Sequence, residues 1–293
     1  MPEGHTVHRV AQLFRDDFVG HHVSTVSPQG RFADGAALLD GHLIESAQAV
    51  GKQLFVYFEG GLVLRVHLGI YGAWSVTNRV EHLSLGAPRA TREEGLIESD
   101  SDAFPPEPIG QVRLRIATHD VVADLRGPTA CEVIDREEAA AAIEALGPDP
   151  MVGPRAKSQA RFVQRMSSTT TPIALALMNQ KLVAGIGNVY RAELLFRHRL
   201  DPFAPAKSLG EETLVELWKD WTKLLADGIK TGVMRTRNDL TPAQFKKSLA
   251  DSRIRYFVYK RDGKPCRVCG THVVMSELGG RKLYFCPSCQ AGN

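Results

Sequence analysis

The residues that follow Met1 form the most unusual pair of reactive groups in the sequence. When Met1 is removed, Pro2 becomes the N-terminal residue and carries a free secondary amine. An α-amino group has a pKa of about 8, and the positive end of a following helix favours its neutral form. A neutral amine can attack an aldehyde-like carbon and form an iminium, with the neighbouring Glu3 as general acid. Many chains begin Met-Pro without such chemistry, so the pair alone does not decide the function.

Four of the five cysteines lie near the C-terminus as two Cys-x2-Cys pairs. The pairs are Cys266 with Cys269 and Cys286 with Cys289, and 16 residues separate them. In a reducing compartment this spacing is typical of metal binding and not of disulfides. Four thiolates close a tetrahedral site and leave no position open for catalysis. The sequence therefore predicts one structural Zn²⁺ ion.

A β-hairpin is expected between the two cysteine pairs. Residues 271–276 and 282–285 have a strand pattern, and Gly279 and Gly280 between them supply the positive φ angles of a tight turn. Arg281 then lies at the tip, where its guanidinium can bind two oxygens of a phosphate. The alternative is a zinc ribbon that only caps the fold, with Arg281 in solvent.

Three more positions are candidates for binding an anion or for holding the residues that do so. Asn188 follows Gly187 at the expected start of a helix, where N–H groups and a cap amide can bind an anion, although an N-cap needs no ligand. Glu193 is expected to face inward and hold this turn through buried hydrogen bonds. Lys52, before a strongly apolar strand, is either a phosphate-facing cation or a lysine whose ammonium reaches solvent.

The elements that must position these residues change character near residue 136. Before it, a helix at 5–18 precedes short strand-like runs without helices between them, which is typical of a sandwich or barrel. An acidic stretch at 93–108 predicts an exposed loop. We expect strands at 22–27, 42–50, 53–58, 61–67, 71–76, 111–118 and 121–126, and helices at 136–146, 155–166, 172–180, 188–199, 210–227 and 242–249.

Composition excludes several classes of protein. The 293 residues include 43% hydrophobic and 24% charged residues, which rules out collagen, coiled coils and wholesale disorder. No apolar run approaches the length of a membrane span, and no signal peptide is visible, so we expect a cytoplasmic protein. Residues 231–293 hold 12 Lys or Arg and four acidic residues, whereas the whole chain has a net charge of +3. This asymmetry indicates a polyanionic partner.

Together these motifs resemble the formamidopyrimidine-DNA glycosylase/endonuclease VIII family, more closely its endonuclease VIII branch. The resemblance extends over residues 2–290 in consistent order. It rests on Pro2-Glu3, Gly51-Lys52, His67-Leu68-Gly69-Ile70-Tyr71-Gly72, Gly185-Ile186-Gly187-Asn188-x-Tyr190-x-x-Glu193, and the four cysteines with Arg281 before Leu-Tyr-Phe-Cys.

The resemblance implies an α+β fold of two domains, with DNA in the cleft between them. A β-sandwich flanked by helices would span 1–135, and a linker with a short helix would span 136–155. A helical domain with a helix–two-turn–helix motif would follow at 156–255, and the four-cysteine zinc hairpin at 256–293. The protein would be a monomer, free of membranes and associated with the nucleoid when it acts.

The implied activity is that of a bifunctional DNA glycosylase and AP lyase of base excision repair. It would remove oxidised bases from damaged double-stranded DNA and cut the strand by β,δ-elimination. Pro2 would be the nucleophile and Glu3 the proton donor to the sugar. Phosphates would be bound by Lys52 and Arg281, which serve catalysis directly, and by Asn188. Ile70 would fill the gap left by the flipped base, and Arg126 would contact DNA.

The sequence also departs from the family. The usual start is Pro-Glu-x-Pro-Glu, but His5 and Thr6 stand at the last two positions. The purine-specific branch has Asp-x-Arg-Arg-Phe-Gly where this chain reads Asp-Leu-Arg126-Gly-Pro, which lacks the second arginine and the stacking phenylalanine. This favours oxidised pyrimidines, with oxidised purines as the alternative. A non-catalytic zinc-containing DNA-binding protein is the rival from another class.

Overall fold

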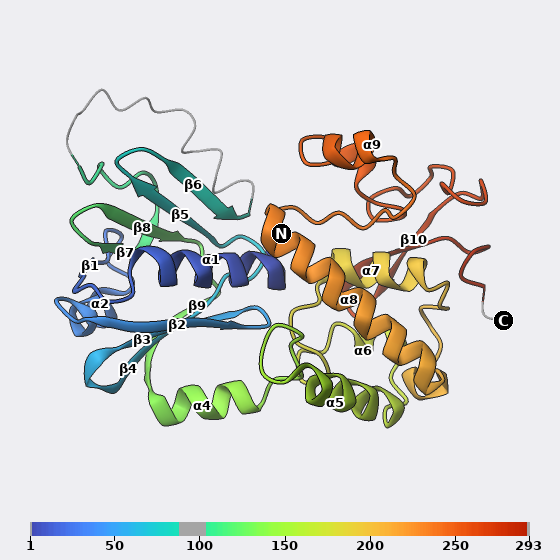
Figure 1. Ribbon diagram of the computed structural model, residues 1–293, viewed down its shortest axis with the longest axis horizontal. Helices are drawn as coiled ribbons and strands as arrows, with labels where there is room; N and C mark the ends of the chain where they lie inside the picture. The colour runs from blue at the N-terminus through green and yellow to red at the C-terminus, as the bar shows by residue number, and fades with distance from the viewer. Residues whose placement is uncertain (1, 88–103, 292–293) are drawn as a thin grey trace. The chain divides into compact units, whose positions relative to one another are not determined.

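The computed structural model describes residues 2–87 and 104–291, and the chain separates into two compact units. Unit 1 comprises Met1–Ala145 and unit 2 comprises Leu146–Asn293. Figure 1 shows that unit 1 holds the large sheets whereas unit 2 is mainly helical. This is the two-domain α+β fold expected from the sequence, with a small hairpin at the end of unit 2.

Unit 1 is built from two antiparallel sheets. One has the strand order β1-β7-β8-β5-β6 and the other β2-β3-β4-β9. Several partners are distant in sequence, since β1 pairs with β7 and β4 with β9. The strands are β1 (Ser24–Val26), β2 (Ile44–Val50), β3 (Gln53–Phe58), β4 (Leu62–His67), β5 (Ala73–Asn78), β6 (His82–Gly86), β7 (Val112–Ala117), β8 (Val121–Arg126) and β9 (Ala130–Asp135).

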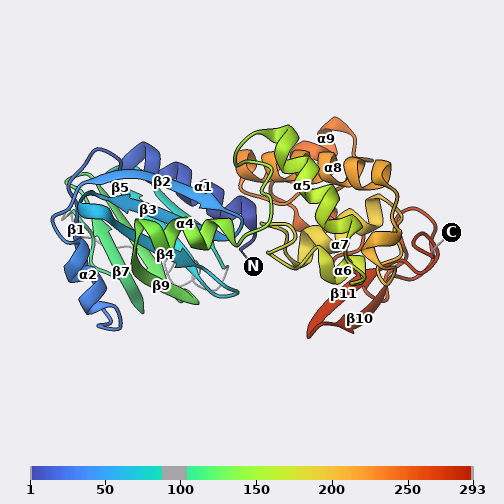
Figure 2. The ribbon, with the colours of Figure 1, turned by 90° about the horizontal axis from the view of Figure 1, so that it is seen from below.

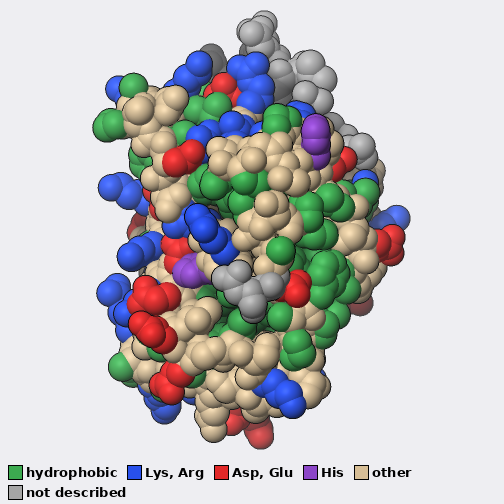
Figure 3. Space-filling model, turned by 90° about the vertical axis from the view of Figure 1, so that its right-hand side faces the viewer, with side chains coloured by type: hydrophobic (Ala, Val, Ile, Leu, Met, Phe, Trp, Pro, Cys, Tyr) green, Lys and Arg blue, Asp and Glu red, His purple; other side chains and the backbone are tan. Residues whose placement is uncertain are grey.

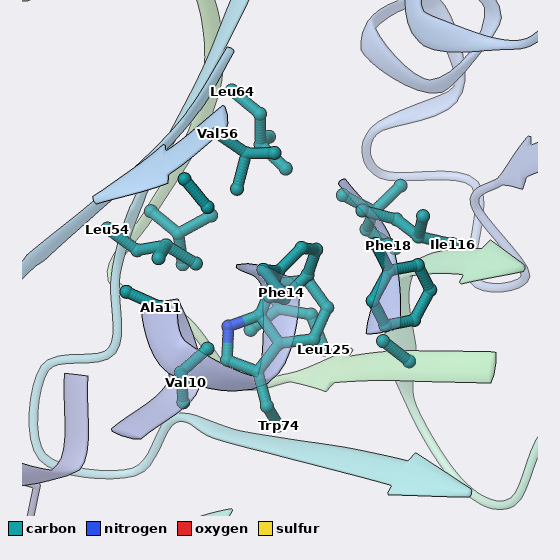
Figure 4. Packing of buried hydrophobic residues seen from close by; sticks show 14 of the residues in the cluster. Val10, Ala11, Phe14, Phe18, Leu54, Val56, Leu64, Trp74, Ile116 and Leu125 are labelled. Carbon is teal, nitrogen blue, oxygen red and sulfur yellow. The ribbon is translucent and has the colours of Figure 1, made fainter. Parts of the chain in front are cut away.

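Helix α1 (Gly4–Asp17) anchors the core of unit 1. Its apolar face is buried, and the rings of Phe14 and Phe18 stack with centroids 4.9 Å apart. Phe14 also meets Trp74 of β5 edge to face at 5.1 Å, as the close view in Figure 4 shows. Because α1 is fixed along its length, the residues at its start have a defined place. Among the described residues of unit 1, the further helices are α2 (Ala33–Leu39), η1 (Glu59–Gly61) and α4 (Arg136–Glu144).

Unit 2 packs its helices around a second aromatic core. Phe162 contacts Trp218, and Tyr190 contacts Trp221, with ring centroids 5.1 and 4.7 Å apart. The elements are α5 (Arg155–Ser167), α6 (Ile173–Ala176), α7 (Asn188–Arg197), η3 (Ala206–Ser208), α8 (Glu211–Thr231), α9 (Pro242–Lys247), η4 (Ser252–Ile254), β10 (Val274–Leu278) and β11 (Arg281–Phe285).

The structure adds elements that the sequence patterns did not predict. These are α2, β6 and β9, and the expected helix at 172–180 is reduced to the single turn of α6. The loop expected at 93–108 falls largely outside the described residues. Between α8 and β10 the segment around α9 is folded, with a capping box at Thr241 and Gln244.

Candidate functional site

The two candidate catalytic residues lie at the start of α1. Pro2 is buried, and Glu3 is the N-cap residue with 0% of its surface exposed. The backbone carbonyl of Glu3 accepts from the N–H of Thr6 at 3.0 Å, but its side chain does not cap the helix. The N-terminal segment therefore lies against the positive end of the helix dipole, where a neutral amine is favoured over a charged one.

His5 and Thr6 continue this buried surface. His5 is 4% exposed and Thr6 7%, and the Thr6 Oγ1 lies 3.3 Å from the His5 Nε2. Burial, followed by the charges of the chain N-terminus, Arg9 and His8, lowers the pKa of His5 to about 3. His5 is therefore a neutral imidazole near pH 7. Sequence patterns alone gave no role to this residue.

Lys52 lies in the two-residue turn between β2 and β3. The strands pair up to Val50 and Gln53, and Gly51 has a φ of 60°. Across the sheet Gln53 pairs with His67. Burial lowers the pKa of His67, and the nearby charges of Lys52 and Arg65 lower it further. Lys52 thus adds positive charge at the end of β4, where the next candidate loop begins.

The loop between β4 and β5 exposes two large apolar side chains. Ile70 is 50% exposed and Tyr71 is 67% exposed. The loop is tight, because Gly69 has a φ of 64° and a Cβ at that position would lie 1.8 Å from the Thr129 Oγ1. The Gly72 N–H also donates to the Leu68 carbonyl at 2.9 Å. The sequence predicted Ile70 as a wedge, and the structure adds its exposed neighbour Tyr71.

Arg126, which the resemblance implies as a DNA contact, lies within the sheet of unit 1. It is 6% exposed, and its Nε donates to the Ile109 carbonyl at 2.8 Å while its Nη1 donates to the Ser75 Oγ at 2.6 Å. Its Nη2 lies 3.4 Å from Asp124, whose carboxylate accepts two hydrogen bonds from Arg115 at 2.7 and 2.8 Å. We therefore leave Arg126 out of the phosphate contacts, because its guanidinium is engaged inside unit 1.

The four C-terminal cysteines converge in unit 2. Their sulfur atoms all lie within 4.8 Å of one another, with Cys266 and Cys289 3.9 Å apart and Cys269 and Cys286 3.5 Å apart. A tetrahedron with Zn–S distances of about 2.3 Å has sulfurs about 3.8 Å apart. The geometry and the soft thiolate donors fit a zinc ion. Among residues 2–87 and 104–291, these four form the only such cluster of possible metal ligands.

The hairpin between the cysteine pairs is tighter than expected. β10 and β11 pair up to Leu278 and Arg281, so the turn consists of Gly279 and Gly280, whose φ angles are 60° and 69°. A Cβ on Gly279 would lie 2.6 Å from a side-chain atom of Leu175 in α6, which shows how closely the turn packs on the helices. Arg281 itself is exposed. A fixed backbone thus presents an exposed guanidinium.

Asn188 joins the start of α7 to this hairpin. Its Nδ2 donates to the Lys282 carbonyl at 2.8 Å, and its Oδ1 accepts from the buried Arg191. Arg191 also donates to the Lys282 carbonyl at 3.0 Å. The N-cap residue is Gly187, one position earlier than expected, and Asn188 is the first helical residue. Its amide carries a second hydrogen beyond the one that binds Lys282.

Glu193 faces inward, as expected, but it holds a different segment. Its carboxylate accepts from the Thr236 Oγ1 at 2.5 Å and from the N–H groups of Phe257, Val258 and Tyr259 at 2.8 Å each. It is 0% exposed. The buried carboxylate of Glu193 therefore fixes the segment that leads into the cysteine hairpin. It does not bind the turn at 185–188.

The positive charge of residues 231–293 is partly compensated. Arg235 pairs with Asp227, and Arg237 and Arg253 pair with Asp239 and Asp251. Figure 3 shows Lys and Arg side chains along the left edge of the face that it displays, with Asp and Glu side chains among them in its lower half. Asp239 and Asp251 already count in the net charge of this segment, whereas Asp227 lies outside it and pairs with one further cation.

Comparison with known sequences decides the family. Residues 1–130 match the formamidopyrimidine-DNA glycosylase N-terminal domain, and residues 146–239 match the H2TH domain of the same glycosylase. Residues 263–292 match the zinc finger found in FPG and IleRS. The chain belongs to the formamidopyrimidine-DNA glycosylase and endonuclease 8 family. Members of this family are DNA glycosylases and AP lyases of base excision repair.

Individual family members cover the whole chain. It is 42% identical to Endonuclease 8 1 of Mycobacterium tuberculosis, over 99% of this chain and 100% of that protein. It is 31% identical to formamidopyrimidine-DNA glycosylase of Gluconobacter oxydans, over the same shares. The crystal structure of the MutM (Fpg) protein from Thermus thermophilus covers both chains fully, with a TM-score of 0.69 and 25% identity. A complex of the Lactococcus lactis Fpg with DNA containing an abasic site has a TM-score of 0.74, 20% identity and 99% coverage of both chains.

Against the family pattern, the start of α1 is the main departure. The family position of a second glutamate is taken by Thr6, which contacts the neutral His5. The glycosylase fold is otherwise retained, and among residues 2–87 and 104–291 no helix has the length and apolarity that a membrane span requires.

Proposed function

We propose that this chain excises oxidised bases from duplex DNA and then cuts the strand, with Pro2 as nucleophile. The observation that carries the proposal is the burial of Pro2 and Glu3 together at the start of α1, in a unit that matches the glycosylase N-terminal domain. An amine at a helix start is favoured in its neutral, nucleophilic form, and a carboxyl group adjacent to it can move protons.

The reaction follows from these two groups. The Pro2 nitrogen attacks C1′ of the damaged nucleoside, so that a carbon–nitrogen bond forms while the bond to the base breaks, and the proton that the Pro2 nitrogen loses neutralises the departing base. Glu3 protonates the sugar ring oxygen, and ring opening leaves an iminium between Pro2 and the sugar. The iminium acidifies the C2′ proton. Loss of this proton expels the 3′ phosphate. Loss of the C4′ proton then expels the 5′ phosphate, and water hydrolyses the iminium to release Pro2.

Binding would come from groups on both units. In unit 1, Lys52 lies half-buried in the turn between β2 and β3, and Ile70 and Tyr71 form an exposed apolar pair, suited to filling the space left by an extruded base. In unit 2, Arg281 offers its guanidinium to a phosphate, and Asn188 offers the second hydrogen of its amide while the first holds Lys282. Phosphate contacts of this kind make binding sensitive to salt.

The four cysteines would hold one structural Zn²⁺ ion. Zinc bound by four thiolates has no open coordination position, so it supplies rigidity and no bond-breaking step. Its effect on DNA would pass through the hairpin, whose turn packs on Leu175 and whose strand β11 begins at Arg281.

Oxidised pyrimidines are the proposed substrate class. The segment after β8 reads Gly127-Pro128, so it lacks the arginine and phenylalanine of the purine-specific pattern, and Arg126 is buried. The 42% identity to an endonuclease 8 supports this choice over the 31% identity to a formamidopyrimidine-DNA glycosylase. Cleavage of duplexes that each carry one lesion tests it, and a preference for 8-oxoguanine over oxidised pyrimidines would overturn it.

Reduction with borohydride on duplex DNA containing an abasic site tests the activity itself. The iminium should be converted into a stable covalent adduct of protein and DNA. A chain with an N-terminal tag left in place has no free amine at Pro2 and should form no adduct, whereas the same tag at the C-terminus should permit it. DNA binding without any adduct from the untagged chain would favour the non-catalytic DNA-binding protein instead.

A further inference from the structure

Helix α5 of unit 2 carries a row of cations on its surface. Lys157, Arg161 and Arg165 follow one another at intervals of four residues, so they lie along one side of the helix. Phe162, which follows Arg161, and Met166, which follows Arg165, are buried in the core. Lys157 and Arg161 are exposed and Arg165 is half-buried. Figure 1 shows α5 beside α8, and in the view from below α5 faces the viewer (Figure 2).

The row continues onto the turn that follows α6. The Arg165 Nη1 donates to the backbone carbonyl of Lys181, whose own side chain is exposed. We call these four cations, Lys157, Arg161, Arg165 and Lys181, the α5 stripe. The turn that holds Lys181 leads directly to Asn188 at the start of α7. The stripe is therefore continuous along the chain with a candidate phosphate-binding position.

The charges of the α5 stripe are not neutralised within the protein. In the described parts of the chain, no carboxylate forms an ion pair with any of its four members, and α5 contains no acidic residue. Elsewhere in the same unit, Arg197 is bound by both oxygens of Asp220, and Arg235 by Asp227. Burial lowers the pKa of Arg165, and the charge of Arg161 lowers it further, as expected for crowded cations.

We propose that the α5 stripe binds the phosphate backbone of duplex DNA beyond the damaged nucleotide. The inference rests on the proposed function and extends its DNA contacts to a second surface of unit 2. Cations repeated about every 6 Å along a helix suit a linear polyanion better than a single anion. Duplex DNA is favoured over an acidic protein segment because the stripe leads into the Asn188 turn.

A pair of matched double variants tests the inference. K157Q/R161Q removes two cations of the stripe and keeps Arg165, which holds the Lys181 carbonyl. K219Q/K223Q removes two lysines with the same spacing from α8, where Lys219 pairs with Glu216. Binding to lesion-containing duplexes of about one and about three helical turns is measured by fluorescence anisotropy over a range of salt concentrations. Melting temperatures confirm that both variants remain folded.

For K157Q/R161Q we expect binding to the longer duplex to weaken about tenfold, with the slope of log K against log salt reduced by about 1.8, because two phosphate contacts are lost. The loss should be smaller on the shorter duplex, and K219Q/K223Q should retain the wild-type slope. An unchanged salt slope in K157Q/R161Q would overturn the inference. Polyglutamate serves as a probe for an acidic protein segment, and a variant that binds DNA like the wild type but no longer binds polyglutamate would also overturn it. Failure of the wild-type chain to form a borohydride adduct would instead contradict the proposed function.

Discussion

Among the residues that the structure describes, each unit buries one glutamate completely, and the two are placed very differently. Glu193 lies inside α7 and accepts hydrogen bonds from a hydroxyl group and three backbone N–H groups. Glu3 lies at the first turn of α1, beside Pro2, and its side chain does not cap that helix. Both are 0% exposed. Burial alone therefore does not distinguish a carboxylate that holds the fold from one that takes part in chemistry.

The neighbouring groups make the distinction. Four donors bind the carboxylate of Glu193 and fix the segment that leads to the cysteine hairpin. Glu3 is adjacent in sequence to Pro2, the proposed nucleophile, and lies two residues before His5, whose pKa is lowered so that its imidazole is neutral near pH 7. We therefore expect substitution of Glu3 to change the reaction, and substitution of Glu193 to change the stability of unit 2.

The largest expected effect is that of Glu3→Gln. Removal of the acid should slow base excision and strand cleavage by a factor of about 10² to 10⁴ in single-turnover assays, because general acid catalysis is lost. The melting temperature should change little, since the amide is nearly the same size. Glu45→Gln, at an exposed position that pairs with Arg136, is the control and should retain the wild-type rate. A cleavage rate for Glu3→Gln within about threefold of wild type would remove Glu3 from the mechanism.

Glu193→Gln should mainly lower stability. The amide cannot accept from four donors, and the buried N–H groups left without a charged acceptor should reduce the free energy of unfolding by about 3 kcal/mol. Urea denaturation measures this change, and release of zinc should occur at lower urea concentration. Glu216→Gln, at an exposed position on α8, should leave the free energy of unfolding nearly unchanged. Equal stability of the two variants would make Glu193 dispensable for the fold.

His5 should make the stability of unit 1 depend on pH. Its pKa falls from 6.5 to about 3 in the folded chain, so the unfolded chain binds the additional proton. The contribution of neutral His5 to the free energy of unfolding is therefore fully present above pH 6.5. It is lost as the pH falls toward 3, by about 1.4 kcal/mol per pH unit. Urea denaturation of the wild-type chain and of His5→Gln between about pH 7 and pH 5 measures the difference. Equal slopes in the two proteins would show that His5 is not buried as a neutral group.

The smallest expected effect is that of Arg281→Gln, an exposed group in unit 2. Binding to lesion-containing DNA should weaken, with the salt slope reduced by about 0.9 for one lost phosphate contact. Melting temperature should be unchanged because Arg281 is exposed. Lys264→Gln, also exposed in the zinc-binding segment, serves as the matched control. A slope equal to that of wild type would show that Arg281 does not contact phosphate.

Short-range patterns in the sequence predicted much of the fold. The periodicity of Val7, Val10, Phe14 and Phe18 located α1, and the cysteine spacing located the four-cysteine cluster that the structure brings together. Two consecutive glycines predicted the hairpin turn. These features depend on residues close in sequence, so local rules suffice to detect them.

Long-range partners could not be predicted in the same way. The pairing of β4 with β9, the hydrogen bonds from Thr236 and residues 257–259 to Glu193, and the bond between Asn188 and Lys282 each join distant segments. Arg126 is the clearest case. The sequence did contain an indication that Arg126 pairs within the protein. Asp124 and Arg126 are two residues apart on β8, so their side chains lie on the same face of the sheet. Their partner Arg115 lies on β7, however, and only the strand register shows that it faces Asp124.

Mass spectrometry of the borohydride-reduced complex tests the central claim most directly. After nuclease and protease digestion, we expect an N-terminal peptide that lacks Met1 and carries the reduced sugar remnant on the Pro2 nitrogen. Fully active protein that retains Met1, or a remnant attached to a lysine such as Lys52, would contradict the assignment of Pro2 as the nucleophile.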